Sequence, residues 1–485
     1  RVPGVWIVAP QQMELFILRQ GKFMTQSQVE QLLARLLVAC PPAVQELPTE
    51  ARPPLPAVPP VQVSGDDQAT DALIPREALE DAALEAALKA PLADWMTFLH
   101  PTQARLVHRK LNGPSRISGA AGTGKTVVAL HRLAYLADRR PGKLLYVTFV
   151  KSVPRVLGTA YARMSPHTAD RVEFSTIHGW ANRFLRQRGF NPKVDGKGEA
   201  FDAAWTRAGR PSTLATFGSK AYWRDEVQRV IRGRGIESLD EYLALDRIGR
   251  GTRLGSHQRR AVWSLLEAYR EELDARELVD FEDLLRLARD EYRREPADPG
   301  YDVVVLDEAQ DMTLVAMQLV ELLSSGKPDG LLVVGDDQQR VFPGGYRLTE
   351  AGIDVTGRST RLSSNYRNTR EILEAAQELI YGDDDDLLEG IRQPSFVDVV
   401  RAGAAPVFVR SNRASHDGAF ISQVREVLGY RTRSTDGVAA IVERRLDADA
   451  TRSLLDRHDV PHVDLAVWDG TATSAVIIGA NKSAK

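Results

Sequence analysis

The stretch RISGAAGTGKTVVALHRL, residues 116–133, decides the fold, because a glycine-rich loop here precedes an apolar helical pattern. Gly119, Gly124, Lys125 and Thr126 match G-x-x-x-x-G-K-[ST] without a mismatch. In this motif, glycines let backbone N–H groups surround phosphates, and the following helix points its positive end at them. We therefore predict a phosphate-binding loop that includes Gly122, with Lys125 on the β- and γ-phosphates and Thr126 as a Mg²⁺ ligand. A glycine-rich turn is the simpler interpretation.

A second stretch, VVVLDEAQD at residues 303–311, places two acids at the end of an apolar strand pattern. A carboxylate in this position can hold Mg²⁺, and its neighbour can orient and deprotonate an attacking water. A charged loop tip is the alternative, but it does not explain acids that end an apolar strand downstream of a phosphate loop. We predict Asp307 as a metal ligand and Glu308 as the catalytic base.

Other apolar runs predict the architecture around these two motifs. KLLYVTFV at 143–150 and GLLVVGD at 330–336 are short and continuous. Such runs are typical of parallel strands with helices on both faces. Mostly helical patterns occupy residues 190 to about 280 and indicate a helical insertion. The predicted class is α/β, of the P-loop NTPase type.

The N-terminal region predicts a separate small piece. Residues 1–40 combine two short strand patterns, VWIVAP and MELFIL, with a helical pattern, SQVEQLLARLLVA, and indicate an α+β module. Residues 41–60 contain eight prolines, which favours an extended spacer. We therefore predict a Pro-rich linker and helix over residues 41–90.

Composition limits the possible partners and compartment. The chain has 485 residues, of which 43% are hydrophobic and 26% charged, as is ordinary for a soluble globular protein of several domains. It contains no apolar run of membrane-spanning length. One cysteine, Cys40, excludes an internal disulfide and fits a cytoplasmic location. The net charge is −2, so nucleic-acid binding would need a local groove.

Taken together, these motifs resemble the UvrD/Rep-like branch of superfamily 1 helicases. Further segments match in the family's order: FLHPTQARLV (98–107), YVTFVK (146–151), EFSTIHGWANRFL (173–185), LVDFEDLL (278–285), VVGDDQQRVF (333–342), SSNYRNTREIL (363–373) and VAAIVERRLDADATRSLLDRHDVPH (438–462). The resemblance covers roughly residues 91–485. It implies two RecA-like motor domains, the first at 91–352 with the insertion as a 1B-like part, and the second, incomplete, at 353–485.

The resemblance also implies ATP as the nucleotide and assigns further roles. Gln103 and Tyr366 would bind adenine, Gln339 would sense the γ-phosphate, and Arg367 would reach it. The implied catalytic set is Lys125, Glu308, Gln339 and Arg367. The implied contacts to single-stranded DNA are Thr148, Phe149, Lys151, His178, Phe342 and Tyr346. A packed core residue or a surface salt bridge is the alternative for each of these side chains taken alone.

An arginine-rich segment at residues 229–260 allows two interpretations. Its arginines are Arg229, Arg232, Arg234, Arg247, Arg250, Arg253, Arg259 and Arg260. Acidic residues are interspersed among them. The segment predicts either a second nucleic-acid grip or a solvated helical face, with equal weight.

The sequence departs from the family pattern in three places. PGGYR at 343–347 stands where relatives carry a base-stacking tryptophan. Only about a dozen residues separate DRHDVPH from SAVIIGANKSAK, so we expect no large 2B insertion there. ANKSAK at 480–485 is similar to the beginning of motif V, so we expect the chain to be a fragment.

The function implied is an ATP-dependent single-stranded DNA translocase or helicase, moving 3′ to 5′, in DNA repair or genome maintenance. An alternative is a nucleotide-switched regulatory ATPase that gates the N-terminal module or a protein partner. A subunit of a helicase–nuclease is a weaker alternative.

Overall fold

The computed structural model describes most of the chain from residue 101 onward. The described residues are 5–6, 99, 101–151, 153–247, 253–297, 300–324, 326–336, 345–380, 398–409, 415–429, 438–442, 445–465, 467–468 and 475–480. The chain divides into two compact units. The larger comprises 91–370, 384–402 and 433–485, and the smaller comprises 1–90, 371–383 and 403–432.

A six-stranded sheet forms the centre of the larger unit. Its strands are all parallel and lie in the order β4-β3-β5-β6-β2-β7. Their bounds are β2 (Ser115–Gly119), β3 (Lys143–Thr148), β4 (Val172–Thr176), β5 (Tyr301–Leu306), β6 (Leu331–Gly335) and β7 (Ser359–Leu362). The predicted α/β fold class is confirmed.

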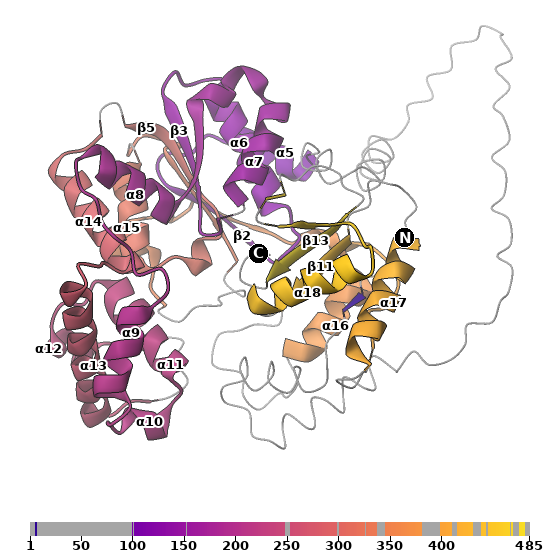
Figure 1. Cartoon of the computed structure of the whole chain (residues 1–485). Helices are drawn as coiled ribbons and strands as arrows, with labels where there is room; N and C mark the ends of the chain where they lie inside the picture. Colours follow the sequence, from indigo (N-terminus) through magenta and orange to yellow (C-terminus); the bar gives the residue numbers. More distant parts are fainter. Residues whose placement is uncertain are drawn as a thin grey trace, which may run out of the picture. The chain divides into compact units, whose positions relative to one another are not determined.

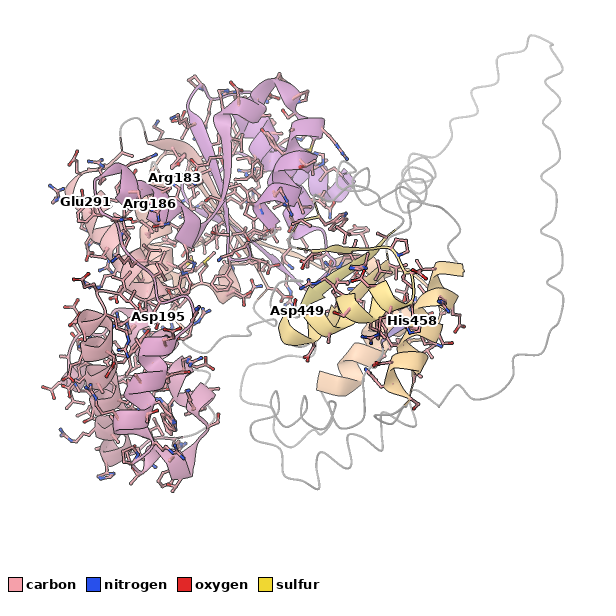
Figure 2. The ribbon with its side chains drawn as sticks, in the orientation of Figure 1. Arg183, Arg186, Asp195, Glu291, Asp449 and His458 are labelled. Atoms are coloured by element: carbon pink, nitrogen blue, oxygen red, sulfur yellow. The ribbon has the colours of Figure 1, made fainter. Side chains whose placement is uncertain are left out.

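Alternate residues of the central strands point to opposite faces, and helices cover both faces (Figure 1). Leu144 and Tyr146 pack with α5 (Pro101–His108), α6 (Lys125–Ala137) and α7 (Val153–Met164). Leu145 and Val147 pack with α8 (Ile177–Gln187), α14 (Phe281–Arg294) and α15 (Leu314–Leu323). Burial on both faces explains why these strands read as continuous apolar runs.

Parallel pairing brings the loops after several strands to one edge of the sheet. Ser118 pairs with Gly335 at the ends of β2 and β6, and Leu306 pairs with Val333 near the ends of β5 and β6. The chain leaves β2 into the glycine-rich loop and α6, and leaves β5 into the acidic pair. In open α/β sheets this carboxyl edge is where ligands bind.

The helical insertion has its own core. It contains α9 (Glu199–Ala204), η2 (Trp205–Gly209), α10 (Leu214–Phe217), α11 (Lys220–Asp225), η3 (Glu226–Ile231), η4 (Arg232–Arg234), α12 (Leu239–Ala244) and α13 (Ser256–Ala275). Phe201, Trp223, Tyr242 and Tyr269 are fully buried in that core. The insertion therefore packs around its own aromatic residues rather than relying on the sheet for a core.

Further strands follow the six-stranded sheet. β7 pairs with β2, so the first sheet extends past residue 352, where the sequence predicted the second motor domain to begin. β8 (Ser364–Thr369) pairs with β9 (Asp398–Arg401). A three-stranded parallel sheet has the order β11-β13-β12, with β11 (Val438–Val442), β12 (His462–Asp464), β13 (Val476–Ala480) and α18 (Arg445–Arg457). The division into two motor domains stays a prediction.

The smaller unit contains β1 (Val5–Trp6), which pairs in parallel with β10 (Val407–Phe408). It also contains α17 (His416–Gly429) and nearly all of α16 (Arg370–Ile380). Apart from Val5 and Trp6, the predicted N-terminal module and Pro-rich linker lie outside the described residues. Within the described parts of the chain, we find no helix long and apolar enough to cross a membrane.

Candidate nucleotide and nucleic-acid site

The glycine-rich loop after β2 needs glycine for two reasons. Gly122 and Gly124 have φ values of 84° and 82°, in the left-handed region that side chains disfavour. The loop is also tightly enclosed. A Cβ atom on Gly122 would lie 2.6 Å from the side-chain oxygen of Asn365, and one on Gly124 would lie 2.7 Å from the amide nitrogen of Gln103. A side chain at either position would therefore be strained and would displace the side chain of Asn365 or Gln103.

Lys125 folds back over this loop. Its Nζ donates hydrogen bonds to the carbonyl oxygens of Gly119, at 2.7 Å, and Ala120, at 2.9 Å. Burial lowers the pKa of Lys125, while the carboxylates of Asp336, Glu308 and Asp307 oppose the shift. The ammonium therefore lies within electrostatic range of three acids that follow β5 and β6. A bound phosphate would offer it stronger, charged acceptors than the two carbonyls.

Asp307 is buried and accepts three hydrogen bonds. Its Oδ2 accepts from the hydroxyls of Thr126, at 2.8 Å, and Tyr146, at 2.7 Å, and its Oδ1 accepts from the Glu308 N–H at 2.9 Å. Burial and the charge of Glu308 raise the pKa of Asp307. The two predicted metal ligands, Thr126 and Asp307, thus meet. They fit Mg²⁺, which proteins usually bind through one or two oxygen ligands together with phosphate and water.

Glu308 has a left-handed backbone, with φ 55° and ψ 42°. For a residue with a side chain this conformation costs roughly 1–3 kcal/mol and persists only where the surroundings hold it. Gln310 supplies part of that support. Its Nε2 donates to the Glu308 carboxylate, and its Oε1 accepts from the Asp336 N–H at 2.9 Å. Gln310 therefore joins the predicted base to the end of β6.

Sequence analysis did not identify Tyr146 or Gln310. Gln310 stood in the acidic motif, and an amide that both donates and accepts could have drawn attention to it. Tyr146 carried no local signal, because it lies within a strand that reads as ordinary core. Its partner Asp307 is 161 positions away in sequence.

Gln103, the predicted adenine contact, is buried beside the loop. Its Nε2 donates to the Thr123 carbonyl at 3.1 Å. The helix that carries it, α5, is attached to α6 by Arg132, which is 2% exposed. Arg132 donates to the carbonyls of Leu106, Val107 and Arg109 near the end of α5 and pairs with Asp329. These bonds hold Gln103 close to the phosphate-binding loop.

The β8 segment contacts the opposite side of the loop. The Tyr366 N–H donates to the Gly122 carbonyl at 2.9 Å, and the Asn365 side chain donates to Ala121 at 2.6 Å. Asn365 also accepts from the Arg367 N–H at 3.1 Å. Burial lowers the pKa of Arg367, and the Glu308 carboxylate opposes that shift. Three of the four predicted catalytic side chains, Lys125, Glu308 and Arg367, therefore lie within electrostatic range of one another; Gln339 lies outside the described residues.

Four of the predicted nucleic-acid residues, Thr148, Phe149, Lys151 and His178, lie at or just after the ends of β3 and β4. The Phe149 and His178 rings make an edge contact with centroids 5.9 Å apart, and His178 makes another with Phe281 at 5.2 Å. Burial, with the charges of Arg229 and Lys151, lowers the pKa of His178 to about 3. Its Nε2 and the Thr148 hydroxyl are buried without a hydrogen-bond partner among the described residues. His178 is therefore neutral near pH 7 and can donate or accept.

The remaining predicted contacts differ in position. Lys151 is exposed after β3. Tyr346 is half-buried, and its hydroxyl lies 3.4 Å from the Ala309 carbonyl in the acidic motif. Phe342 lies outside the described residues. The structure therefore brings Thr148, Phe149 and His178 together and places Tyr346 beside the acidic motif.

The interpretation of the arginine-rich segment as a solvated helical face is wrong for five of its arginines, and the interpretation as a nucleic-acid grip stays a prediction. Arg229 donates to the Asp311 carbonyl, Arg232 pairs with Asp280 and Asp283, and Arg234 binds Gly345 and Glu350. Arg247 pairs with buried Glu226, and Arg259 donates to three carbonyls at the end of α12. These arginines are internal connections. Arg253 and Arg260 are exposed, and Arg250 lies outside the described residues.

Comparison with known proteins agrees with these motifs. The profile of the UvrD/REP helicase N-terminal domain matches residues 99–353, more than half of the chain. The chain is 27% identical over 293 residues to the ATP-dependent DNA helicase PcrA of Staphylococcus epidermidis, covering 56% of this chain and 38% of that protein. For PcrA of Staphylococcus aureus, identity is 27% over 300 residues, covering 58% and 39%. The chain thus spans well under half of these relatives, and it belongs to the UvrD/REP helicase family.

Proposed function

We propose that the chain is the ATP-dependent motor of a DNA helicase or single-stranded DNA translocase, moving 3′ to 5′ and acting in DNA repair or genome maintenance. One observation carries the proposal. Lys125, Glu308, Arg367 and the Thr126–Asp307 pair gather around a single phosphate-binding loop at the carboxyl edge of the sheet. The printed name of the staphylococcal relatives, ATP-dependent DNA helicase, supports the same activity.

Each residue of the nucleotide site has a role in this proposal. Lys125 leaves the Gly119 and Ala120 carbonyls and binds the β- and γ-phosphates. Thr126 and Asp307 hold Mg²⁺, which when bound neutralises phosphate charge. Glu308 accepts a proton from the attacking water, and Arg367 binds the γ-phosphate oxygens as their charge is redistributed. Gln103 and Tyr366 bind the adenine, and Gln339 senses the γ-phosphate.

The residues after β3 and β4 would bind the DNA strand. Phe149 offers an aromatic face to a base, and Lys151 offers a charge to a phosphate. Neutral His178 and Thr148 offer buried polar atoms that a phosphate or sugar oxygen can satisfy. Motion of the strand requires that these contacts change as the nucleotide site changes.

The test is ATP turnover by the full-length gene product that carries this sequence, with and without saturating oligothymidylate. We expect turnover to rise with the oligonucleotide and translocation to proceed 3′ to 5′ on a labelled strand. Lys151→Ala should weaken binding and reduce the slope of log K against log salt by about 0.7, one phosphate contact on a single strand. Turnover that ignores the oligonucleotide would favour the regulatory ATPase instead.

A further inference from the structure

The short helical stretch formed by η3 and η4, here called the junction segment (Glu226–Arg234), connects the insertion to the motor. Three of the arginines leave this segment toward different parts of the sheet domain. Arg232 reaches Asp280 and Asp283 at the start of α14, and Arg234 reaches Gly345 and Glu350 beyond β6. These two ion-paired arginines fix the segment in place, so the third arginine has a defined position.

That third arginine, Arg229, lies between the predicted DNA contact and the acidic motif. Its guanidinium carbon is 5.1 Å from the centroid of the Phe149 ring, within cation–π range. Its Nη1 donates to the Asp311 carbonyl at 3.1 Å. A guanidinium is planar and rigid, so the orientation of its face toward Phe149 also fixes the orientation of the N–H groups along its edge. A change at Phe149 therefore alters the geometry offered to Asp311.

Asp311 is closely connected to the predicted base. It ends η5 (Ala309–Asp311), and its N–H donates to the Glu308 carbonyl at 3.0 Å. Glu308 holds its left-handed backbone only because its neighbours enforce it. A small movement of η5 therefore changes the support of the Glu308 backbone, whose conformation depends on its surroundings.

The packing beside Arg229 makes the connection stiff. A Cβ atom on Gly233 would lie 2.8 Å from the methyl carbon of Thr313, the residue that precedes α15. The junction segment therefore packs tightly against the beginning of this helix. Thr313 in turn donates to Glu282 at 2.8 Å, and Glu282 is buried beside Arg229. Close packing of this kind transmits displacement rather than absorbing it.

We propose that Arg229 is a positioning residue that couples occupancy of the DNA site at Phe149 to the orientation of Glu308, and so makes the insertion part of the switch that turns on ATP hydrolysis. A base that stacks on Phe149 changes the ring face available to Arg229. Arg229 transmits the change through Asp311 to the backbone of Glu308. This inference rests on the proposed function, because it explains how DNA would stimulate turnover.

The experiment compares Arg229→Lys and Arg229→Gln with wild type. Lysine keeps the charge without the planar fork, whereas glutamine keeps a donor for Asp311 without the cation over Phe149. The measured quantity is the ratio of turnover with saturating oligothymidylate to turnover without it, alongside oligothymidylate affinity by fluorescence anisotropy. We expect affinity to change less than about threefold and the ratio to fall by at least about fivefold, the lower end of typical coupling between sites.

Arg259→Lys is the matched control, since Arg259 is half-buried in the same insertion and its described hydrogen bonds go to backbone carbonyls of the insertion itself, those of Tyr242, Leu243, Leu245 and Leu254. We expect it to keep the wild-type ratio. Thermal melting shows whether either Arg229 variant loses the fold. A variant that melts at the same temperature as Arg259→Lys is folded, and its turnover ratio decides whether Arg229 couples the two sites. A wild-type ratio in that variant overturns the inference alone. A wild-type protein without stimulation overturns the proposed function, and with it the coupling.

Discussion

The phosphate-binding loop and the arginine-rich segment are both dense in charged and polar residues, yet their charges face different partners. In the loop region, Lys125, Asp307 and Glu308 lie within electrostatic range of one another, where we propose that a triphosphate and its metal ion bind. In the insertion, Arg229, Arg232, Arg234, Arg247 and Arg259 are bound to groups of the protein itself. A high density of charged residues in a sequence therefore does not by itself identify a ligand site.

The two regions also differ in how their charges are balanced. Acids at the nucleotide site repel one another, and burial with the Glu308 charge raises the pKa of Asp307. A bound cation would relieve this repulsion. In the insertion, Arg232, Arg234, Arg247 and Arg259 already have acid or carbonyl partners within the protein, so they stabilise the fold. Substitutions should consequently reduce catalysis in the first region and, apart from those at Arg229, stability in the second.

The largest effect is expected at Glu308. Glu308→Gln keeps the shape of the side chain but removes its capacity to accept a proton from water. We expect turnover to fall by roughly 10²–10⁴-fold. ATP affinity, measured by a fluorescent analogue, should stay near the wild-type value. Turnover close to wild type would exclude Glu308 as the base. It would also remove the proposed difference between catalytic charges at the loop and structural charges in the insertion.

Arg247→Ala tests the other region. The change leaves the Glu226 carboxylate, which is fully buried, without the guanidinium that binds both of its oxygens. We expect a loss of about 3–5 kcal/mol in the free energy of unfolding, measured by urea denaturation.

The matched control for Arg247 is Arg207→Ala, which removes a half-exposed arginine that pairs with Glu271. That variant should lose no more than about 1 kcal/mol. Equal losses in the two variants would mean that burial does not distinguish these ion pairs.

Tyr146→Phe tests the nucleotide site by removing one hydroxyl, which donates a hydrogen bond to Asp307. Asp307 then keeps the Thr126 and Glu308 donors but loses the third. Partners that orient a metal ligand are typically worth 10–100-fold in metal affinity. We expect a loss at the low end of that range, about tenfold, in Mn²⁺ affinity in the presence of ATP, measured by electron paramagnetic resonance. The stacking of this ring on Phe174 is retained, so an unchanged melting temperature is the control.

A pH dependence is expected at the contact between Glu282 and the insertion. Burial raises the pKa of Glu282 to about 7, against the opposing influence of Arg229 and the Thr313 hydrogen bond. The folded state therefore binds this proton more tightly than the unfolded state, and Glu282 makes stability fall as pH rises from about 4.5 to about 7. In Glu282→Gln that fall should be smaller by on the order of 1–3 kcal/mol. Parallel stability curves for the two proteins would contradict the shift.

Local sequence was sufficient for the parts of the site that depend on neighbouring residues. The glycine-rich loop and Lys125 form one uninterrupted stretch, and its backbone geometry follows from the glycines. Asp307 and Glu308 follow a strand whose continuous apolar run indicates burial on both faces. These features could be predicted because the residues that produce the chemistry are adjacent along the chain.

Other features depend on residues that only folding brings together. Tyr146 meets Asp307 across two strands, Arg229 meets Asp311 from the insertion, and Asn365 meets the loop at Ala121 from β8. A buried hydrogen bond or ion pair is chosen by the three-dimensional positions of its partners, and nothing in the intervening sequence encodes that choice. The sequence by itself therefore determined the phosphate loop, the acidic pair and the α/β class. Tertiary structure alone decided which side chains hold them in position, and which groups of the protein the arginines of the insertion bind.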